Sequence, residues 1–105
     1  MTKYIFGYHG GSGMPQDAAE QAAIMDAWGR WYGELGDAIV DGGSPVGAAR
    51  TVGSDGSATA GGGTNPLTGY TVVEAADLDA ATAMAGGCPV LANGGSVEVA
   101  ETIEM

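Results

Sequence analysis

The stretch Lys3-Tyr4-Ile5-Phe6-Gly7-Tyr8-His9 opens the chain with a mixture of aromatic and β-branched residues, which is typical of a half-buried strand. We expect this strand to cover residues 4–8. The pattern then becomes helical, and we expect a long helix over residues 15–36. Large apolar residues recur there at helical spacing and define the face that must lie on a sheet: Ile24, Trp28, Trp31 and Leu35.

The rest of the chain continues this alternation of strand and helix. A second helix is expected after the N-cap candidate Asp77, and Gly86-Gly87 ends it. Further strands are expected at four places: residues 38–41, 50–52, 68–74 and 96–100. Whether the segment near Arg50 is separate from the strand 68–74 stays open. The order β-α-β-β-α-β predicts an α+β protein of the ferredoxin-like split βαβ type, an antiparallel sheet with two helices on one face.

The length of 105 residues predicts a single domain, residues 1–105. Few large side chains are available to fill its core. We expect this role for eight of them: Ile5, Phe6, Trp28, Trp31, Leu35, Tyr70, Leu78 and Leu91.

The charge of the chain is strongly acidic. The chain has thirteen carboxylates and only three basic residues, Lys3, Arg30 and Arg50, which gives a net charge of -10. This charge repels phosphate backbones and anionic lipid surfaces, so neither nucleic acid nor a membrane is an expected partner. The carboxylates act either as a solubilising coat or as a cation site, and their scattered positions do not predict a metal site.

Cys88 is the only cysteine, which excludes an internal disulfide and a cysteine-based metal site. We interpret it as a buried apolar thiol and expect no cofactor. No apolar leader precedes Gly7, and the long uncharged stretch 80–97 is broken by glycine and proline. A cytoplasmic location is therefore expected.

Motifs distributed along nearly the whole chain point to a family. They are Tyr4-Ile5-Phe6-Gly7-Tyr8, Glu34-Leu35-Gly36, Val40-Asp41-Gly42-Gly43, Gly69-Tyr70-Thr71-Val72-Val73-Glu74-Ala75, Asp77-Leu78-Asp79-Ala80-Ala81, Cys88-Pro89 and Gly95-Ser96-Val97-Glu98-Val99. In this order the chain resembles the YCII-related (DGPF-domain) family. The resemblance implies a dimeric α/β barrel, in which the sheets of two subunits pack together, so we expect a homodimer.

The resemblance also implies a catalytic His on the first helix, beside an Asp. Residues 24–28 of this chain contain no His, and Gly62-Gly63-Thr64-Asn65-Pro66 stands where the Asp-Gly-Pro-Phe signature is expected. The chemistry must therefore be sought in other residues.

His9 is the only histidine and is the first candidate for general acid–base catalysis near neutral pH. Its expected partner is Asp41 or Asp26. Strands on either side of the first helix are parallel in this plan, so His9 and Asp41 would emerge at one sheet edge. The alternative is a loop histidine bonded to a backbone group.

A small-molecule pocket is expected between helix and sheet. Its predicted lining is Tyr8, Trp28, Trp31, Tyr32, Arg50 and Tyr70. The aromatic residues equally suit a core. Arg50 would meet a carboxylate ligand, or pair with Asp41 or Glu74. The turn Gly10-Gly11-Ser12-Gly13 would bind an anion or serve only as a flexible connection.

Two functions are consistent with these features. In the first, the protein is a homodimer that performs cofactor-free acid–base chemistry on a small organic substrate, with His9 and Asp41 or Asp26. In the second, it is a non-catalytic accessory protein that binds a small ligand or a protein.

Overall fold

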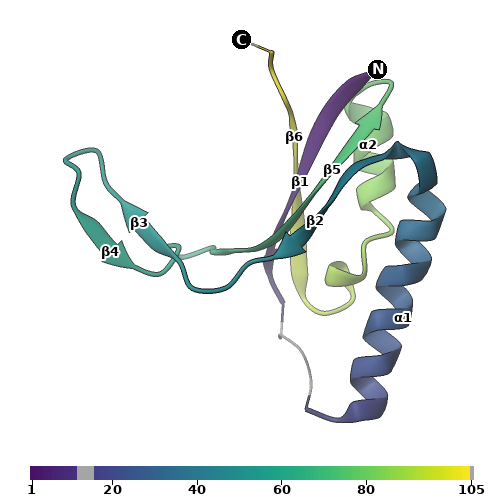
Figure 1. Ribbon diagram of the computed structural model, residues 1–105, viewed down its shortest axis with the longest axis horizontal. Helices are drawn as coiled ribbons and strands as arrows, with labels where there is room; N and C mark the ends of the chain where they lie inside the picture. Colours follow the sequence, from purple (N-terminus) through teal and green to yellow (C-terminus); the bar gives the residue numbers. More distant parts are fainter. Residues whose placement is uncertain (12–15, 105) are drawn as a thin grey trace.

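Strand β1 (Thr2–Gly10) lies inside a four-stranded antiparallel sheet, between β5 (Leu67–Ala75) and β6 (Gly95–Glu101). Strand β2 (Ile39–Pro45) pairs with the other side of β5 and gives the order β2-β5-β1-β6. Figure 1 shows this sheet in the computed structural model, which describes residues 1–11 and 16–104. The architecture is α+β and is compatible with the predicted ferredoxin-like plan.

Two helices cover one face of the sheet (Figure 1). Helix α1 (Ala18–Leu35) begins after the N-cap Asp17, whose carboxylate accepts a hydrogen bond from the Glu20 amide at 3.1 Å. The sequence predicted a start near Pro15, which lies outside the described residues, as do Ser12 and Gly13 of the predicted anion-binding turn. The helix ends at Gly36, as predicted.

Helix α2 (Leu78–Ala85) has the predicted N-cap, because the Asp77 carboxylate accepts from the Ala80 amide at 2.8 Å. Two short 3₁₀ turns complete the helical layer: η1 (Gly36–Ala38) and η2 (Pro89–Leu91). No helix within the described residues is both long and apolar enough to span a membrane.

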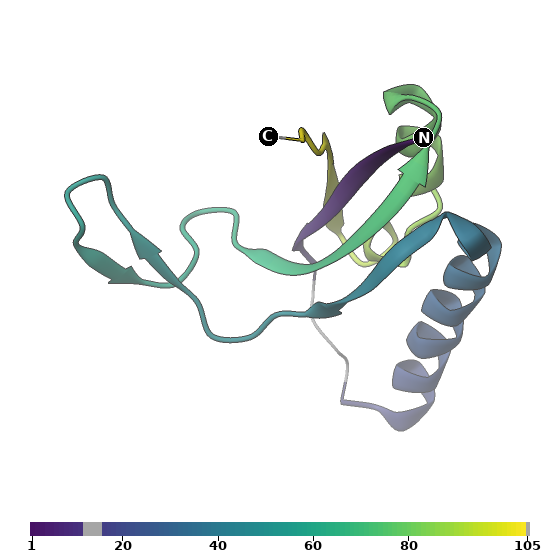
Figure 2. The ribbon, with the colours of Figure 1, turned by 45° about the horizontal axis from the view of Figure 1, so that its top comes forward.

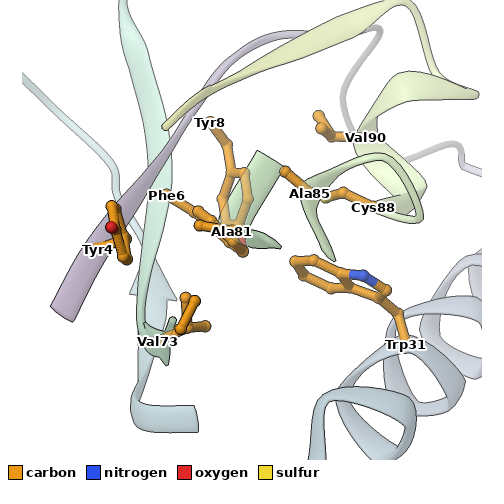
Figure 3. Close-up of a cluster of buried hydrophobic side chains, with 10 residues drawn as sticks. Tyr4, Phe6, Tyr8, Trp31, Val73, Ala81, Ala85, Cys88 and Val90 are labelled. Carbon is orange, nitrogen blue, oxygen red and sulfur yellow. The ribbon is translucent and has the colours of Figure 1, made fainter. Parts of the chain in front are cut away.

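The core lies between the sheet and the two helices. Phe6 and Val73 are fully buried, and Phe6 stacks on Trp31 with ring centroids 6.1 Å apart. Figure 3 shows the side chains of β1 and β5 facing Trp31 on α1 and the small residues Ala81 and Ala85 on α2. Small residues on α2 let this helix approach the sheet closely, so a few aromatic rings fill most of the core volume.

A hydrogen-bonded polar cluster is enclosed in this core. The Tyr8 hydroxyl donates to Thr71 Oγ1 at 2.6 Å, and Thr71 Oγ1 donates to the Gly42 carbonyl at 3.2 Å. The Tyr32 hydroxyl donates to the same carbonyl at 3.1 Å. These bonds join α1, β1, β5 and β2, so the cluster fixes the position of β2 without leaving its hydroxyl groups unpaired.

The opposite face of the sheet carries no helix, and we call it the open face. Because side chains alternate along a strand, the neighbours of the buried Tyr4, Phe6 and Tyr8 point to this side. The register places apolar residues there from β1, β5 and β6: Ile5, Leu67, Tyr70, Val72 and Ala100. Ile5 and Leu67 are 39% and 44% exposed. Ile5, Leu78 and Leu91 were predicted to fill the core, but all three are exposed.

The chain between β2 and β5 forms an arm, residues 46–66. All of its residues are exposed, and it contains a separate hairpin of β3 (Arg50–Val52) and β4 (Ala58–Ala60). In Figures 1 and 2 the arm extends away from the sheet on the side opposite the helices. It raises the radius of gyration to 15.0 Å, against about 13 Å for a compact chain of this length.

Strand β2 is longer than predicted and irregular. Its second half is Gly42-Gly43-Ser44-Pro45, which has low strand propensity, yet it pairs with β5 after two register shifts. Gly43 has a φ of 72°, and a Cβ atom there would overlap the carbonyl oxygen of Tyr70. The backbone of β5 therefore approaches β2 at a point that only glycine allows.

Candidate functional site

A groove of about 620 Å³ lies between α1 and the segment 86–93 that follows α2. Its apolar lining comes from both walls: Ala23, Ile24, Ala27, Trp28, Trp31, Gly86, Gly87, Cys88, Pro89, Val90, Leu91 and Ala92. This volume is in the range of small-molecule sites in proteins.

The aromatic wall of the groove is held rigidly. The Trp28 and Trp31 rings lie 5.7 Å apart at 77°, and Trp28 also packs edge-to-face on Tyr8 at 5.2 Å. Trp31 Nε1 donates a hydrogen bond to the Met84 carbonyl at 3.0 Å. A Cβ atom at Gly87 would lie 3.2 Å from the Trp31 ring, so the opposite wall comes close to the indole here. Trp31 is buried and Trp28 is partly exposed, which leaves Trp28 as the ring available to a ligand.

Three polar side chains complete the groove. Arg30 and Glu34 lie one turn apart on α1, and Asn93 follows η2 on the facing wall. The groove therefore combines an apolar body with one cation, one carboxylate and one amide, the pattern expected for a site that orients an organic molecule.

The groove also contains the buried thiol of Cys88. Burial raises the pKa of this thiol to about 11. A thiol with this pKa is almost fully protonated near neutral pH and is a poor nucleophile. Cys88 thus acts as an apolar part of the wall, as the sequence indicated.

The raised pKa of Cys88 predicts slow reaction with a disulfide reagent in the native state. At pH 8 about one thiol in a thousand would be ionised, against roughly one in four for an ordinary cysteine. We expect the rate measured with Ellman's reagent to be at least about a hundredfold lower than in concentrated urea. The native rate should keep rising up to about pH 10. Equal rates with and without urea at pH 8 would contradict this assignment.

The structure divides the predicted pocket among three places. Only Trp28 and Trp31 line the groove. Tyr8 and Tyr32 belong to the polar cluster in the core, and burial raises the pKa of Tyr8.

The other two predicted pocket residues lie elsewhere. Tyr70 belongs to the open face, and Arg50 begins β3 in the arm. Of the predicted lining, only Trp28 and Trp31 of α1 belong to the groove, and the face that carries them contributes both to the core and to one wall.

His9 lies on the open face, on the far side of the sheet from the groove. A Cβ atom at Gly7 would lie near His9 Nε2, Leu67 and Glu98, which places all of them on this face. His9 Nε2 lies 3.2 Å from Glu98 Oε1, and His9 Nδ1 lies 3.0 Å from the Asn65 carbonyl oxygen. The ring thus has a backbone acceptor on one side and an exposed carboxylate on the other.

The structure brings neither predicted aspartate to His9. Val72 pairs with both Ile5 and Asp41, so Asp41 lies level with Ile5. This offset places Asp41 about 13 Å along the strands and about 10 Å across them from His9. The Asp41 carboxylate instead accepts from the Gly43 amide at 2.8 Å. Asp26 is exposed on α1, on the other side of the sheet.

Sequence reasoning missed the carboxylate that does meet His9. Glu98 lies between Val97 and Val99, and this alternation indicates a strand with Glu98 on its exposed face. The pairing of Gly7 with Glu98 supplies the remaining information, and that pairing is a long-range contact. Arg30 and the segment 86–93 were missed because no local pattern shows that this segment faces α1.

Within residues 1–11 and 16–104 no group of three or more His, Cys, Asp or Glu side chains is arranged to hold a metal ion. Neither a protein-family profile nor a curated protein matches the chain at a significant level. The resemblance to the YCII-related family remains a prediction from the sequence.

Proposed function

We propose that this protein binds a small organic molecule in the groove between α1 and residues 86–93. The observation that supports this most is the composition of the groove, where Trp28 and a wall of small apolar residues face Arg30, Glu34 and Asn93. A ligand with a flat apolar body and one anionic or hydrogen-bonding group matches this lining. The raised pKa of Cys88 favours binding over nucleophilic chemistry at this place.

Both tryptophans of the chain line the groove, so intrinsic fluorescence reports its occupancy directly. We expect anilinonaphthalene sulfonate, an aromatic body with one anionic group, to quench this fluorescence saturably. Members of a metabolite library that occupy the groove should displace the dye.

A pair of variants on α1 locates the binding. Ala23→Phe fills the groove and should weaken binding of the dye by at least about tenfold, because the added ring occupies the ligand volume. Ala22 is exposed and does not line the groove, so Ala22→Phe should bind as the wild type does. Equal binding by both variants would place the ligand elsewhere.

A second candidate function is acid–base chemistry on the open face, and the pair of His9 and Glu98 favours it. A backbone acceptor at Nδ1 holds the ring in one orientation and directs Nε2 toward the open face. Glu98 lies on the edge strand β6, at the margin of the open face, and is 70% exposed, so it can move to admit a substrate there. We expect His9→Gln to abolish any turnover found in the library screen while dye binding in the groove is unchanged. Unchanged turnover would remove His9 from consideration.

We also propose that the fold is the ferredoxin-like split βαβ plan and that two copies pack through their open faces. The sheet order and the exposed apolar residues Ile5 and Leu67 of the open face support this assembly. The motifs quoted above support a relationship to the YCII-related family. A cytoplasmic location is part of the proposal, and the unpaired thiol of Cys88 is compatible with it.

The open-face dimer predicts a mass in solution of twice the chain mass of 10.3 kDa. Ile5→Glu should produce monomers, because it places a charge in the centre of the packed face. Met25→Glu is the matched control, since Met25 is exposed on α1 and outside the open face. Light scattering coupled to size exclusion measures both. A wild-type mass of one chain would contradict the dimer.

A further inference from the structure

The arm, residues 46–66, forms a hairpin that stands apart from the four-stranded sheet. Strands β3 and β4 have three residues each, and every residue of the arm is exposed. Isolated two-stranded hairpins are marginally stable in water because they bury too little apolar surface. Val52 is 67% exposed and does not belong to the buried core. A surface that packs on the arm is therefore missing from the single chain.

The direction of the arm indicates where that surface lies. In Figures 1 and 2 the arm leaves the sheet on the side away from α1 and α2, which is the side of the open face. Its base meets the open face where the Asn65 carbonyl lies 3.0 Å from His9 Nδ1, and it is joined to β5 where the Val46 amide donates to the Thr68 carbonyl at 3.1 Å. A body packed on the open face would therefore lie beside the arm.

The charge of the arm favours a second copy of this chain as that body. The arm carries Arg50 and Asp55 and is neutral, so the rest of the chain carries the whole net charge of -10. Arg50 is exposed and makes no ion pair within the described residues. Three carboxylates border the open face: Asp41, Glu74 and Glu98. Glu74 is opposite Lys3 and Glu98 lies 3.2 Å from His9, so Asp41 is the carboxylate of this border with no basic residue opposite it in the sheet register.

We propose that the β3–β4 hairpin of each subunit clasps the body of its partner, with Arg50 against the carboxylates that border the partner's open face. This inference rests on the proposed homodimer and adds a second contact to it. The neutral arm adds no net charge to a contact between two bodies of like charge, and its Arg50 would attract the carboxylates at the border of the partner's open face.

The experiment removes the hairpin and leaves the open face intact. Ala49 and Gly61 are already joined, since the Gly61 amide donates to the Ala49 carbonyl at 2.9 Å. Replacing residues 50–60 by Asn-Gly therefore closes the arm with a two-residue turn and retains Asn65 and Leu67. We expect the dimer dissociation constant from sedimentation equilibrium to rise at least about tenfold, with an unchanged far-ultraviolet circular dichroism spectrum per residue of the body.

Arg50→Glu tests the charge contact without shortening the chain. We expect it to raise the dissociation constant about tenfold at low salt and less at high salt, because exposed charges are screened. Arg30→Glu makes the same change of charge on α1, away from the open face, and should have a much smaller effect. Equal effects of the two variants would overturn the role of Arg50.

A direct measurement places the arm on the partner. Ser54→Cys chains without nitrogen-15 carry a spin label at the hairpin tip and are mixed with nitrogen-15 chains that carry no spin label. In the mixed dimer the spin label should broaden amide signals from the body of the nitrogen-15 partner. The wild type, treated with the same spin label, shows whether the buried Cys88 also reacts. A dimer that keeps its affinity without residues 50–60 and shows no broadening would overturn the clasp and leave the open-face dimer standing. A monomeric wild type would overturn both.

Discussion

Phe6→Ala should destabilise the protein by about 3–5 kcal/mol. Phe6 is fully buried, stacks on Trp31 and lies beside Val73 at the centre of the only aromatic core that the described residues form. The small residues of α2 cannot expand into the space that the ring leaves, so a cavity remains. The whole stability of a domain of this size is about 5–15 kcal/mol, so this single change removes a large share of it.

Urea titration followed by tryptophan fluorescence measures this change, because Trp31 lies against the ring that is removed. All variants should be compared at one protein concentration, since dimerisation would make the apparent stability depend on it. Met25→Ala is the control, because Met25 is 60% exposed on α1 and should change the stability by no more than about 0.5 kcal/mol. A loss below about 1 kcal/mol for Phe6→Ala would contradict the central position of this ring.

Gly43→Ala should cost more than about 2 kcal/mol. Its φ of 72° lies in the left-handed region, where an L side chain costs roughly 1–2 kcal/mol. In addition, the new Cβ would overlap the carbonyl oxygen of Tyr70, so β2 must move away from β5. That movement would stretch the bonds from Tyr32 and Thr71 to the carbonyl of Gly42.

The neighbouring glycine provides a matched control. A Cβ atom at Gly42 meets no atom within 4 Å, and Gly42 does not have a positive φ. Gly42→Ala should therefore change the free energy of unfolding by less than about 0.5 kcal/mol. If both variants lose the same stability in thermal and urea unfolding, the close approach of β5 to Gly43 is not what determines the effect.

The sequence predicted best those helices and strands whose ends are set by particular residues, such as a helix cap or a terminating glycine. Asp77 caps α2 and Gly36 ends α1, as the capping rules predict, and the strand expected at 68–74 is β5 with one more residue at each end. Strand β2 was predicted too short because its Gly-Gly-Ser-Pro half has no strand signal of its own. Its pairing is imposed by β5 and by the core cluster around Thr71.

The candidate site was only half predictable. Helical spacing correctly grouped Trp28 and Trp31, but a period cannot show whether a stripe borders a core or a groove. The sequence placed Tyr8 in the pocket with that stripe and made the adjacent His9 the candidate catalytic residue. Alternation within β1 places Tyr8 and His9 on opposite faces of the sheet, so the two are separated by the backbone itself. Ile5 was wrongly expected in the core because the same alternation along β1 was not applied: Ile5 and His9 share the open face, while Tyr4, Phe6 and Tyr8 point to the core.

The irregular strand β2 carries a consequence for how the molecule could evolve. Its bulged path ends where the arm begins, and its position depends on hydroxyl groups that reach the Gly42 carbonyl from α1 and β5. The hairpin is thereby separated from the core: residues 50–60 can be lengthened, shortened or replaced while the backbone bond between Gly61 and Ala49 closes the loop. The sequence of this segment can therefore diversify at little risk to folding, because the part of the chain that must stay constant is separate from the part that can vary.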